Sequence, residues 1–353
     1  MSSSTLGRIR WAAAIAGAVV AVTSAVSWVV PGEAAAAACN TVSSGSGGLA
    51  GGGAYGCAKA GELLDVRIGD VLPTQPSLGY DEVYYKLGRY TLGKDEINKK
   101  FDDWCEANGQ GVAASATPGA KLSDPSSFAC TIAVGKETAD SIAPMKTVVI
   151  GPGGQAYLTD GHHTLTSFLE TPDGGANSHV RLRVLDNLSN LSTQDFWDRM
   201  KANGWVWLQD VAGKPIQVGQ LPRTLGLANF ADDKYRSLMY FGRDIGYEAG
   251  TIPFQEFYWG AWMRDSNVVG DWNRNDPAAY LAAVKTVTEK QVALGAGTVV
   301  AAGKTAGELG ALAAWNDGKA ATKGEFAKLS VPYSEAKPGK IAYAIEYRLR
   351  NKR

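Results

Sequence analysis

Residues 147–170 have the sequence TVVIGPGGQAYLTDGHHTLTSFLE, which begins with an apolar run and a Gly-Pro-Gly-Gly turn. A second extended run ends in Asp160-Gly161-His162-His163-Thr164, and residues 165–170 have the character of a helical turn. The pattern predicts two strands joined by a tight turn and followed by a helix. It therefore places an acid and two imidazoles where a strand is followed by the N-terminus of a helix.

Such a junction offers chemical groups of three kinds. The N–H groups at a helix N-terminus lack partners inside the helix, so the backbone from Gly161 to Thr164 can hold an anionic oxygen. His162 or His163 can act as a general base or as a nucleophile. Asp160 can orient an imidazole or join a metal site. The alternative is a tight turn whose histidines are satisfied by hydrogen bonds.

The sequence leaves the metal requirement open. Neighbouring residues on a helix point about 100° apart, so both histidines cannot easily face one point. We expect one to face the substrate while the other packs against the scaffold. A divalent metal would need Asp160, one histidine of the turn and partners from elsewhere, and His179 is the only other histidine of the chain.

Further candidate residues lie outside the turn. Thr74 and Gln75 are enclosed by two prolines, so a rigid segment presents two polar side chains. They either contact the substrate or satisfy the backbone of a loop. Three cationic residues can supply positive charge to a phosphate, each with a salt bridge as its alternative role: Lys86, Arg223 and Arg236.

The charge balance of the chain constrains its partners. The 353 residues include 35 Lys and Arg and 35 Asp and Glu. Proteins that hold nucleic acid through its phosphates usually have a basic excess. A phosphate-containing small molecule or nucleic acid stays open as the ligand, without the strong basic character typical of nucleic-acid binding.

Residues 1–38 have the features of a secretory signal peptide. Two arginines precede an apolar stretch at residues 11–30, and the alanines at 34–38 offer an Ala-x-Ala cleavage site. We expect cleavage near Ala36 or Ala38, export to the periplasm, the cell envelope or the medium, and no membrane association afterwards. The alternative is an uncleaved anchor, because the apolar stretch nearly suffices to span a bilayer.

The cysteines are consistent with export, which permits disulfides. Cys39, Cys57, Cys105 and Cys130 allow three pairings. Pairing of nearest neighbours, Cys39 with Cys57 and Cys105 with Cys130, closes the shortest loops. The spacings contain no Cys-x-x-Cys, which disfavours a zinc ribbon or a thioredoxin-type motif.

The remaining pattern predicts strands, helices and loops. Residues 39–60 are rich in glycine, serine and alanine and predict a flexible leader. Seven of the ten tryptophans lie beyond residue 190, which predicts an aromatic-rich helical layer. The other expected elements are strands at 63–68 and 179–185, helices at 80–87 (ending at Gly88), 94–107 and 195–202 (capped by Ser192 or Thr193), a loop at 108–128, alanine-rich helices within 276–330, and a solvated basic tail at 331–353.

Several of these runs together resemble the ParB-like nuclease family of the ParB/sulfiredoxin superfamily. They are LPTQPSLGY at 72–80, the stretch 151–163, Asp195-Phe196-Trp197, Leu221-Pro222, Tyr235-Arg236-Ser237-Leu238, Phe257-Tyr258-Trp259 and Arg264. The resemblance covers residues 63–270. It implies an α+β fold, with a small mixed sheet and helices in a ParB-like domain at 61–275. We expect the C-terminal part of the chain to be aromatic-rich and mostly helical. Its last region, residues 276–353, is expected to be alanine-rich and helical.

The resemblance also implies where the site lies. In ParB-like members a Gly-x-x-Arg turn binds nucleotide phosphates, and in sulfiredoxins the turn is Gly-Cys-His-Arg with a nucleophilic cysteine. Here His162 replaces that cysteine, which excludes sulfinic acid reduction, and Thr164 replaces the arginine. We expect an exported, nuclease-like hydrolase of a phosphoester or phosphodiester that uses the Asp-Gly-His-His turn. The alternative is a non-catalytic module that binds a nucleotide or other anionic ligand at the same turn.

Overall fold

The strands form a five-stranded mixed sheet within residues 55–353, the part of the chain that the computed structural model describes. In spatial order the strands are β1 (Leu63–Arg67), β8 (His179–Asn187), β6 (Thr147–Gly151), β7 (Gln155–Asp160) and β2 (Val71–Leu72). The pairs β8–β6 and β7–β2 are parallel, and β1–β8 and β6–β7 are antiparallel. The expected signal peptide and most of the expected leader lie outside the described residues.

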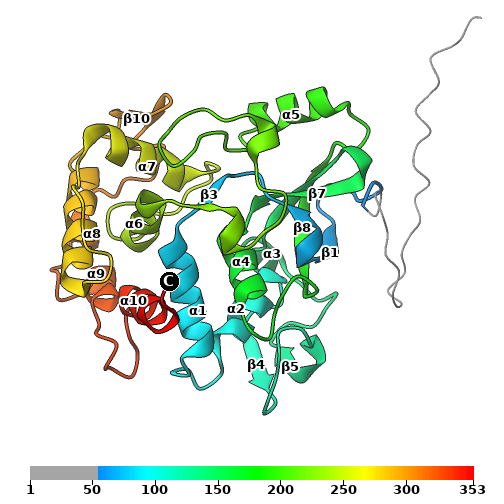
Figure 1. Cartoon of the computed structure of the whole chain (residues 1–353), viewed down its shortest axis with the longest axis horizontal. Helices are drawn as coiled ribbons and strands as arrows, with labels where there is room; N and C mark the ends of the chain where they lie inside the picture. Colours follow the sequence, from blue (N-terminus) through cyan, green and yellow to red (C-terminus); the bar gives the residue numbers. More distant parts are fainter. Residues whose placement is uncertain (1–54) are drawn as a thin grey trace, which may run out of the picture. The chain divides into compact units, whose positions relative to one another are not determined.

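Helices are interspersed with the strands along the chain, so the predicted α+β class is confirmed (Figure 1). Three short strand pairs accompany it: β3 (Ser77–Leu78) with β9 (Ala231–Asp232), β4 (Ala113–Ala116) with β5 (Phe128–Cys130), and β10 (Val299–Ala301) with β11 (Lys304–Thr305). The helices are α1 (Tyr80–Thr91), α2 (Lys99–Ala107), α3 (Ala139–Ile142), α4 (His162–Glu170), α5 (Thr193–Ala202), α6 (Lys234–Gly242), α7 (Gln255–Ser266), α8 (Pro277–Val292), α9 (Gly324–Leu329) and α10 (Lys340–Asn351). Within residues 55–353, none of them combines the length and the apolar character that crossing a bilayer requires.

The strands that carry the site follow their sequence patterns. All five residues of β6 are buried, as a continuous apolar run predicts for a strand covered on both faces. Buried and partly exposed residues alternate along β8. The predicted strand-turn-strand-helix at 147–170 is therefore confirmed as β6, β7 and α4. The helix predicted at 195–202 is also confirmed as α5, where the Ser192 hydroxyl accepts a hydrogen bond from the N–H of Asp195.

The predicted end of α1 at Gly88 is wrong, because the helix continues to Thr91. A Cβ atom at Gly88 would lie 2.8 Å from the carbonyl oxygen of Tyr343 on α10. Figure 1 shows α10 in red beside α1 in cyan, where the two helices pack closely. The glycine thus permits a close helix crossing, and it does not end the helix.

The predicted solvated tail is also wrong. Residues 340–351 form α10, whose apolar face, including Ile341 and Ile345, is buried against α1. Arg348 is buried as well and forms an ion pair with the fully buried Asp81 of α1. The basic composition of the tail concealed an amphipathic helix with a partner carboxylate distant in the sequence.

Two further boundaries differ from the prediction in the region after α1. The helix α2 starts at Lys99, since the side chain of Asn98 caps it by accepting from the N–H of Lys100, and residues 94–98 are not helical. The segment 108–128, predicted as a loop, contains β4 and the first residue of β5. β4 consists of small residues with little β propensity, so the local sequence pattern did not predict a strand there.

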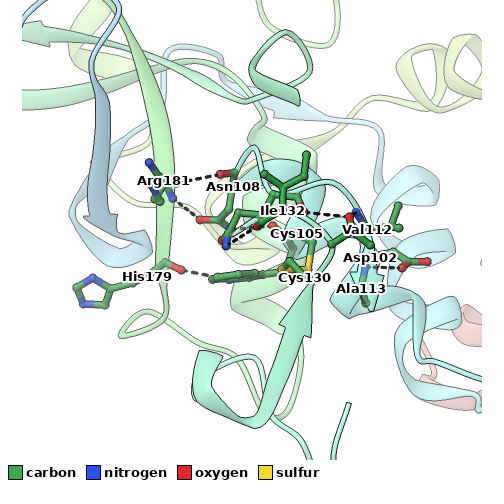
Figure 2. Close-up of a disulfide and its surroundings, with 12 residues drawn as sticks. Asp102, Cys105, Asn108, Val112, Ala113, Cys130, Ile132, His179 and Arg181 are labelled. Carbon is green, nitrogen blue, oxygen red and sulfur yellow. Dashed lines mark hydrogen bonds between the residues drawn. A yellow bond between two sulfur atoms is a disulfide. The ribbon is translucent and has the colours of Figure 1, made fainter. Parts of the chain in front are cut away.

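The predicted disulfide between Cys105 and Cys130 is present and joins the end of α2 to the end of β5 (Figure 2). Beside it, the side-chain oxygen of Asn108 accepts a hydrogen bond from the N–H of Arg181 on β8. The Arg181 guanidinium forms an ion pair with Glu137. The bridge therefore fastens the β4–β5 hairpin to α2 beside the sheet. Cys57 is also disulfide-bonded, and Cys39 lies outside the described residues.

Replacing Cys105 and Cys130 together with alanine should lower the free energy of unfolding by about 3 kcal/mol. The physical reason is that the bridge restricts the unfolded chain between residues separated by 25 positions. Denaturant titration of both proteins without reductant measures the difference. Equal midpoints and slopes would show that the bridge contributes nothing to stability.

Candidate functional site

A pocket of about 660 Å³ lies over the junction between β7 and α4. The turn contributes a continuous part of its lining, residues 159–164. Charged residues from the sheet and from α1, α6 and α7 line it further, together with an apolar wall. These other lining residues include Gln75, Glu82, Lys146, Thr147, Arg183, Leu185, Trp205, Arg236, Arg243, Ile252, Phe254, Glu256 and Phe257.

The backbone at Gly161 brings the chain from β7 into α4. Its φ angle of 104° lies in the region that favours glycine, and a Cβ atom there would lie 2.5 Å from the Cγ atom of Lys146. His162 and His163 are the first two residues of α4 and are both buried. The glycine therefore sets the direction in which the two imidazoles enter the protein.

Both imidazoles accept a hydrogen bond from the backbone of the segment that precedes α1. The Nε2 atom of His162 accepts from the N–H of Thr74 at 3.1 Å. The Nε2 atom of His163 accepts from the N–H of Gly79 at 3.0 Å. Because an accepting nitrogen of a neutral ring carries no proton, the proton of each ring is on Nδ1. The two rings thus hold residues 74–79 against the turn.

Burial keeps both rings neutral near pH 7. It lowers the pKa of His162 to about 3, since the nearby Asp160 carboxylate offsets only part of the effect. Burial and the positive charge of Arg236 hold the pKa of His163 well below its ordinary value. The Nδ1 atom of His163 lies 3.6 Å from the Glu82 carboxylate. Within residues 55–353, Nδ1 of His162 has no hydrogen-bond partner and remains an available donor.

Two arginines of the pocket are neutralised by two glutamates. Arg236 lies between Glu82 and Glu256, with nitrogen–oxygen distances of 3.5 Å and 3.6 Å. Arg243 forms an ion pair with the other oxygen of Glu256. Burial alone would raise the pKa of Glu256, but Arg236 and Arg243 lower it to about 2. The network therefore carries balanced charge beneath the pocket.

Three polar residues of neighbouring strands line the edge of the pocket. Arg183 of β8 pairs with Thr147 of β6, and Thr147 pairs with Asp160 of β7. The β6–β7 register shifts between Thr147 and Val148, and the hydroxyl of Thr147 forms a hydrogen bond with that of Thr159 at 2.8 Å. The Asp160 carboxylate is 65% exposed and lies 3.5 Å from the Nζ atom of Lys146. It is an accessible carboxylate at the mouth of the pocket.

The structure brings most of the sequence-predicted site residues together. Asp160, Gly161, His162, His163, Thr164, Gln75 and Arg236 all line the pocket. The Nε2 group of Gln75 donates to the carbonyl of Ser77, so this side chain also satisfies its own loop. The functional roles assigned to these residues stay predictions.

Three candidates lie elsewhere. Thr74 is fully buried, and its hydroxyl donates to the carbonyl of Leu158 at 2.5 Å, so it supports the turn and does not line the pocket. Lys86 is paired with Asp103 at 3.5 Å. Arg223 is exposed and outside the pocket lining.

Sequence reasoning missed five charged residues of the pocket: Glu82, Lys146, Arg183, Arg243 and Glu256. Arg183 had one signal, since it occupies a polar position of an alternating strand. The other four had none, because tertiary packing alone brings them to the turn.

No metal cluster is formed by the part of the chain that the structure describes. No group of three or more His, Cys, Asp or Glu side chains in residues 55–353 could hold a metal ion. His179 lies at the surface, 3.1 Å from Asp65 of β1. The requirement for a divalent metal stays untested.

A mixed sheet with helices, whose strand-to-helix turn lines a polar pocket, defines the class as an α+β protein. The family model described as "Putative ParB-like nuclease" matches residues 64–265, more than half of the chain. The chain therefore belongs to the ParB-like nuclease family.

The chain is similar to the crystal structure of protein Atu1540 from Agrobacterium tumefaciens, with 22% sequence identity and a TM-score of 0.39. The similarity covers 58% of this chain and 80% of that one. No curated protein matches the chain.

Proposed function

We propose that the chain is an exported hydrolase of a phosphoester or phosphodiester. Membership of the ParB-like nuclease family supports a nuclease-like activity. The observation that carries the proposal is the pocket itself, which combines four cationic side chains, two of them paired with glutamates, with the N-terminus of α4 and an exposed carboxylate. Cationic groups and helix N–H groups stabilise phosphate oxygens, and a carboxylate can accept the proton of an attacking water.

The chemistry assigns different roles to the three residues of the turn. Asp160 is the general base, because its carboxylate is exposed and lies beside the expected phosphate position. His162 is neutral and can donate from Nδ1 to a phosphoryl oxygen. His163 keeps the loop before α1 in place through Gly79. Water attacks the phosphorus atom, Asp160 takes its proton, and the ester oxygen leaves and is protonated by solvent.

The size and lining of the pocket suit a small substrate. A volume of about 660 Å³ lies within the range of small-molecule sites. Trp205, Ile252 and Phe254 add an apolar wall that can pack against the organic part of the ester. The substrate is therefore a phosphate-containing small molecule or one residue of a nucleic-acid strand.

Export is supported by two features of the chain. The N-terminal sequence has the order of a secretory signal. The Cys105–Cys130 bridge and the disulfide of Cys57 are compatible with an oxidising compartment.

A second candidate function is a non-catalytic module that binds an anionic ligand. The hydrogen bonds at Thr74 and Gly79 favour it, because they occupy the Nε2 lone pairs that would otherwise take a proton. In this case the pocket would bind the same ligand class without turnover.

Replacing Asp160 with asparagine should lower the rate of hydrolysis by a factor on the order of 100 or more, because general-base catalysis contributes about that much. Bis(p-nitrophenyl) phosphate is the probe, assayed with magnesium, with manganese and with EDTA. Asp198→Asn is the matched control, since Asp198 is exposed on α5 and outside the pocket.

The two functions give different outcomes in this assay. Turnover by the wild-type protein that Asp160→Asn abolishes and Asp198→Asn preserves supports the hydrolase. Phosphate binding without turnover under all three conditions supports the binding module. Neither binding nor turnover rejects both functions.

A further inference from the structure

Arg183 differs from the other cations of the pocket in having no acidic partner. Arg236 and Arg243 are paired with Glu82 and Glu256, and Lys146 lies near Asp160. No carboxylate within residues 55–353 forms an ion pair with Arg183. Its positive charge is therefore available to an anion that enters the pocket.

The guanidinium of Arg183 also has an unsatisfied donor. Its Nε atom is shielded from solvent and has no hydrogen-bond partner within the described chain. The Nε atoms of Arg236 and Arg243 are unbonded too, but the terminal nitrogens of both residues contact glutamates. Nε lies too deep for a ligand to reach, whereas the terminal nitrogens of Arg183 are not shielded and form no hydrogen bond within residues 55–353, so they are the donors open to an oxyanion.

The pairing of the strands brings Arg183 close to the turn, and its side chain lines the same pocket as Asp160. Arg183, Thr147 and Asp160 follow one another across β8, β6 and β7, where neighbouring strands are roughly 5 Å apart. The carbonyl of Lys146, the residue just before β6, accepts a hydrogen bond from the N–H of Arg183, so the two cationic residues are neighbours. An anion above Thr147 would lie between Arg183 and the general base.

We propose that Arg183 is the phosphate-binding residue of this pocket and that its guanidinium holds two non-bridging phosphate oxygens. The planar fork of arginine matches two oxygens of one phosphate, whereas lysine offers a single point charge. The inference rests on the proposed function, since it names the residue that binds the phosphate of that substrate. It also explains how a turn with Thr164 in its fourth position obtains a cation, which the neighbouring strand supplies.

The test is the binding of inorganic phosphate to the full mature chain, followed by isothermal calorimetry and by the shift of the melting temperature. Arg183→Gln should weaken phosphate binding by roughly tenfold to a hundredfold, because it removes a charged hydrogen-bonding group. Arg183→Lys should retain part of the affinity, since the charge remains without the fork. Without phosphate, the melting temperature of Arg183→Gln should equal that of the wild-type protein, because no ion pair is lost.

Arg223→Gln is the control, since Arg223 is exposed and outside the pocket. It should leave phosphate affinity unchanged. If Arg183→Gln and Arg183→Lys bind phosphate as well as the wild-type protein, the inference is wrong while the proposed function stands. A lower melting temperature of Arg183→Gln without phosphate, at unchanged affinity, would assign Arg183 a structural role. Absence of phosphate binding by the wild-type protein overturns the inference, and the hydrolysis assay of Asp160→Asn then decides the proposed function separately.

Discussion

Acidification from pH 6.5 to about pH 5 should lower the free energy of unfolding by up to about 1.4 kcal/mol per pH unit for each neutral histidine of the turn. The pKa of His162 is about 3 in the folded protein, and burial holds the pKa of His163 well below 6.5. Each ring therefore binds its proton mainly after unfolding. The stability that they contribute is fully present above pH 6.5 and is lost as the pH falls toward the folded-state pKa values.

Between pH 6.5 and about pH 5, the change in the free energy of unfolding comes mainly from the histidines and much less from the carboxylates. The pKa values of Glu256 and Asp103 are about 2, so both groups stay ionised in the folded protein throughout this window. Their contribution is lost as the pH falls from the ordinary carboxyl pKa values, near the lower end of this window, toward about 2. Denaturant titrations at intervals of half a pH unit measure the slope that belongs to the histidines.

Variants at the two histidines test the assignment directly. His162→Gln and His163→Gln keep an oxygen that can accept the N–H of Thr74 or Gly79 but do not titrate. Each should make the slope shallower by up to about 1.4 kcal/mol per pH unit. His179→Gln, at the exposed start of β8, is the matched control and should leave the slope unchanged. Slopes that none of the variants changes would mean that the rings are not held neutral.

Replacing Asp81 with asparagine should lower the free energy of unfolding by about 3–5 kcal/mol, since it leaves buried positive charge without its partner. Asp81 is fully buried in the first turn of α1 and forms ion pairs with Arg348 and with Arg274, the latter at 2.8 Å. The hydroxyl of Tyr280 on α8 donates to the same carboxylate at 2.7 Å. One side chain thereby connects α1 with α8 and α10.

Denaturant titration at pH 7 measures this loss. Arg350→Gln is the control, because Arg350 lies on the same helix as Arg348 but is exposed, and its ion pair with Glu346 lies at the surface. Its midpoint should match that of the wild-type protein. A small loss for Asp81→Asn, comparable to that of the control, would show that the buried network does not stabilise the C-terminal helix.

The predictability of the fold differs between α4 and α10. The strand-turn-strand-helix at 147–170 was predicted correctly, because the apolar run of β6, the glycine turn and the periodicity of α4 are local signals. The burial of α10 was not predicted, because it depends on the approach of α1 at Gly88 and on the carboxylate of Asp81. Those residues are more than 250 positions away in the chain and leave no trace in the pattern of 340–351.

In the pocket, too, some features follow from the sequence alone and others depend on tertiary structure. The sequence alone determined the turn, since Gly161 with φ of 104° and the residues that follow it are neighbours along the chain. Whether a histidine of that turn can accept a proton was decided by tertiary structure, because the donors at Thr74 and Gly79 come from another segment. The position of Arg183 beside Thr147 was likewise decided by the pairing of β8 with β6. Side-chain identity and local backbone are properties of the chain itself, whereas hydrogen-bond partners, burial and charge pairing exist only once distant segments pack together.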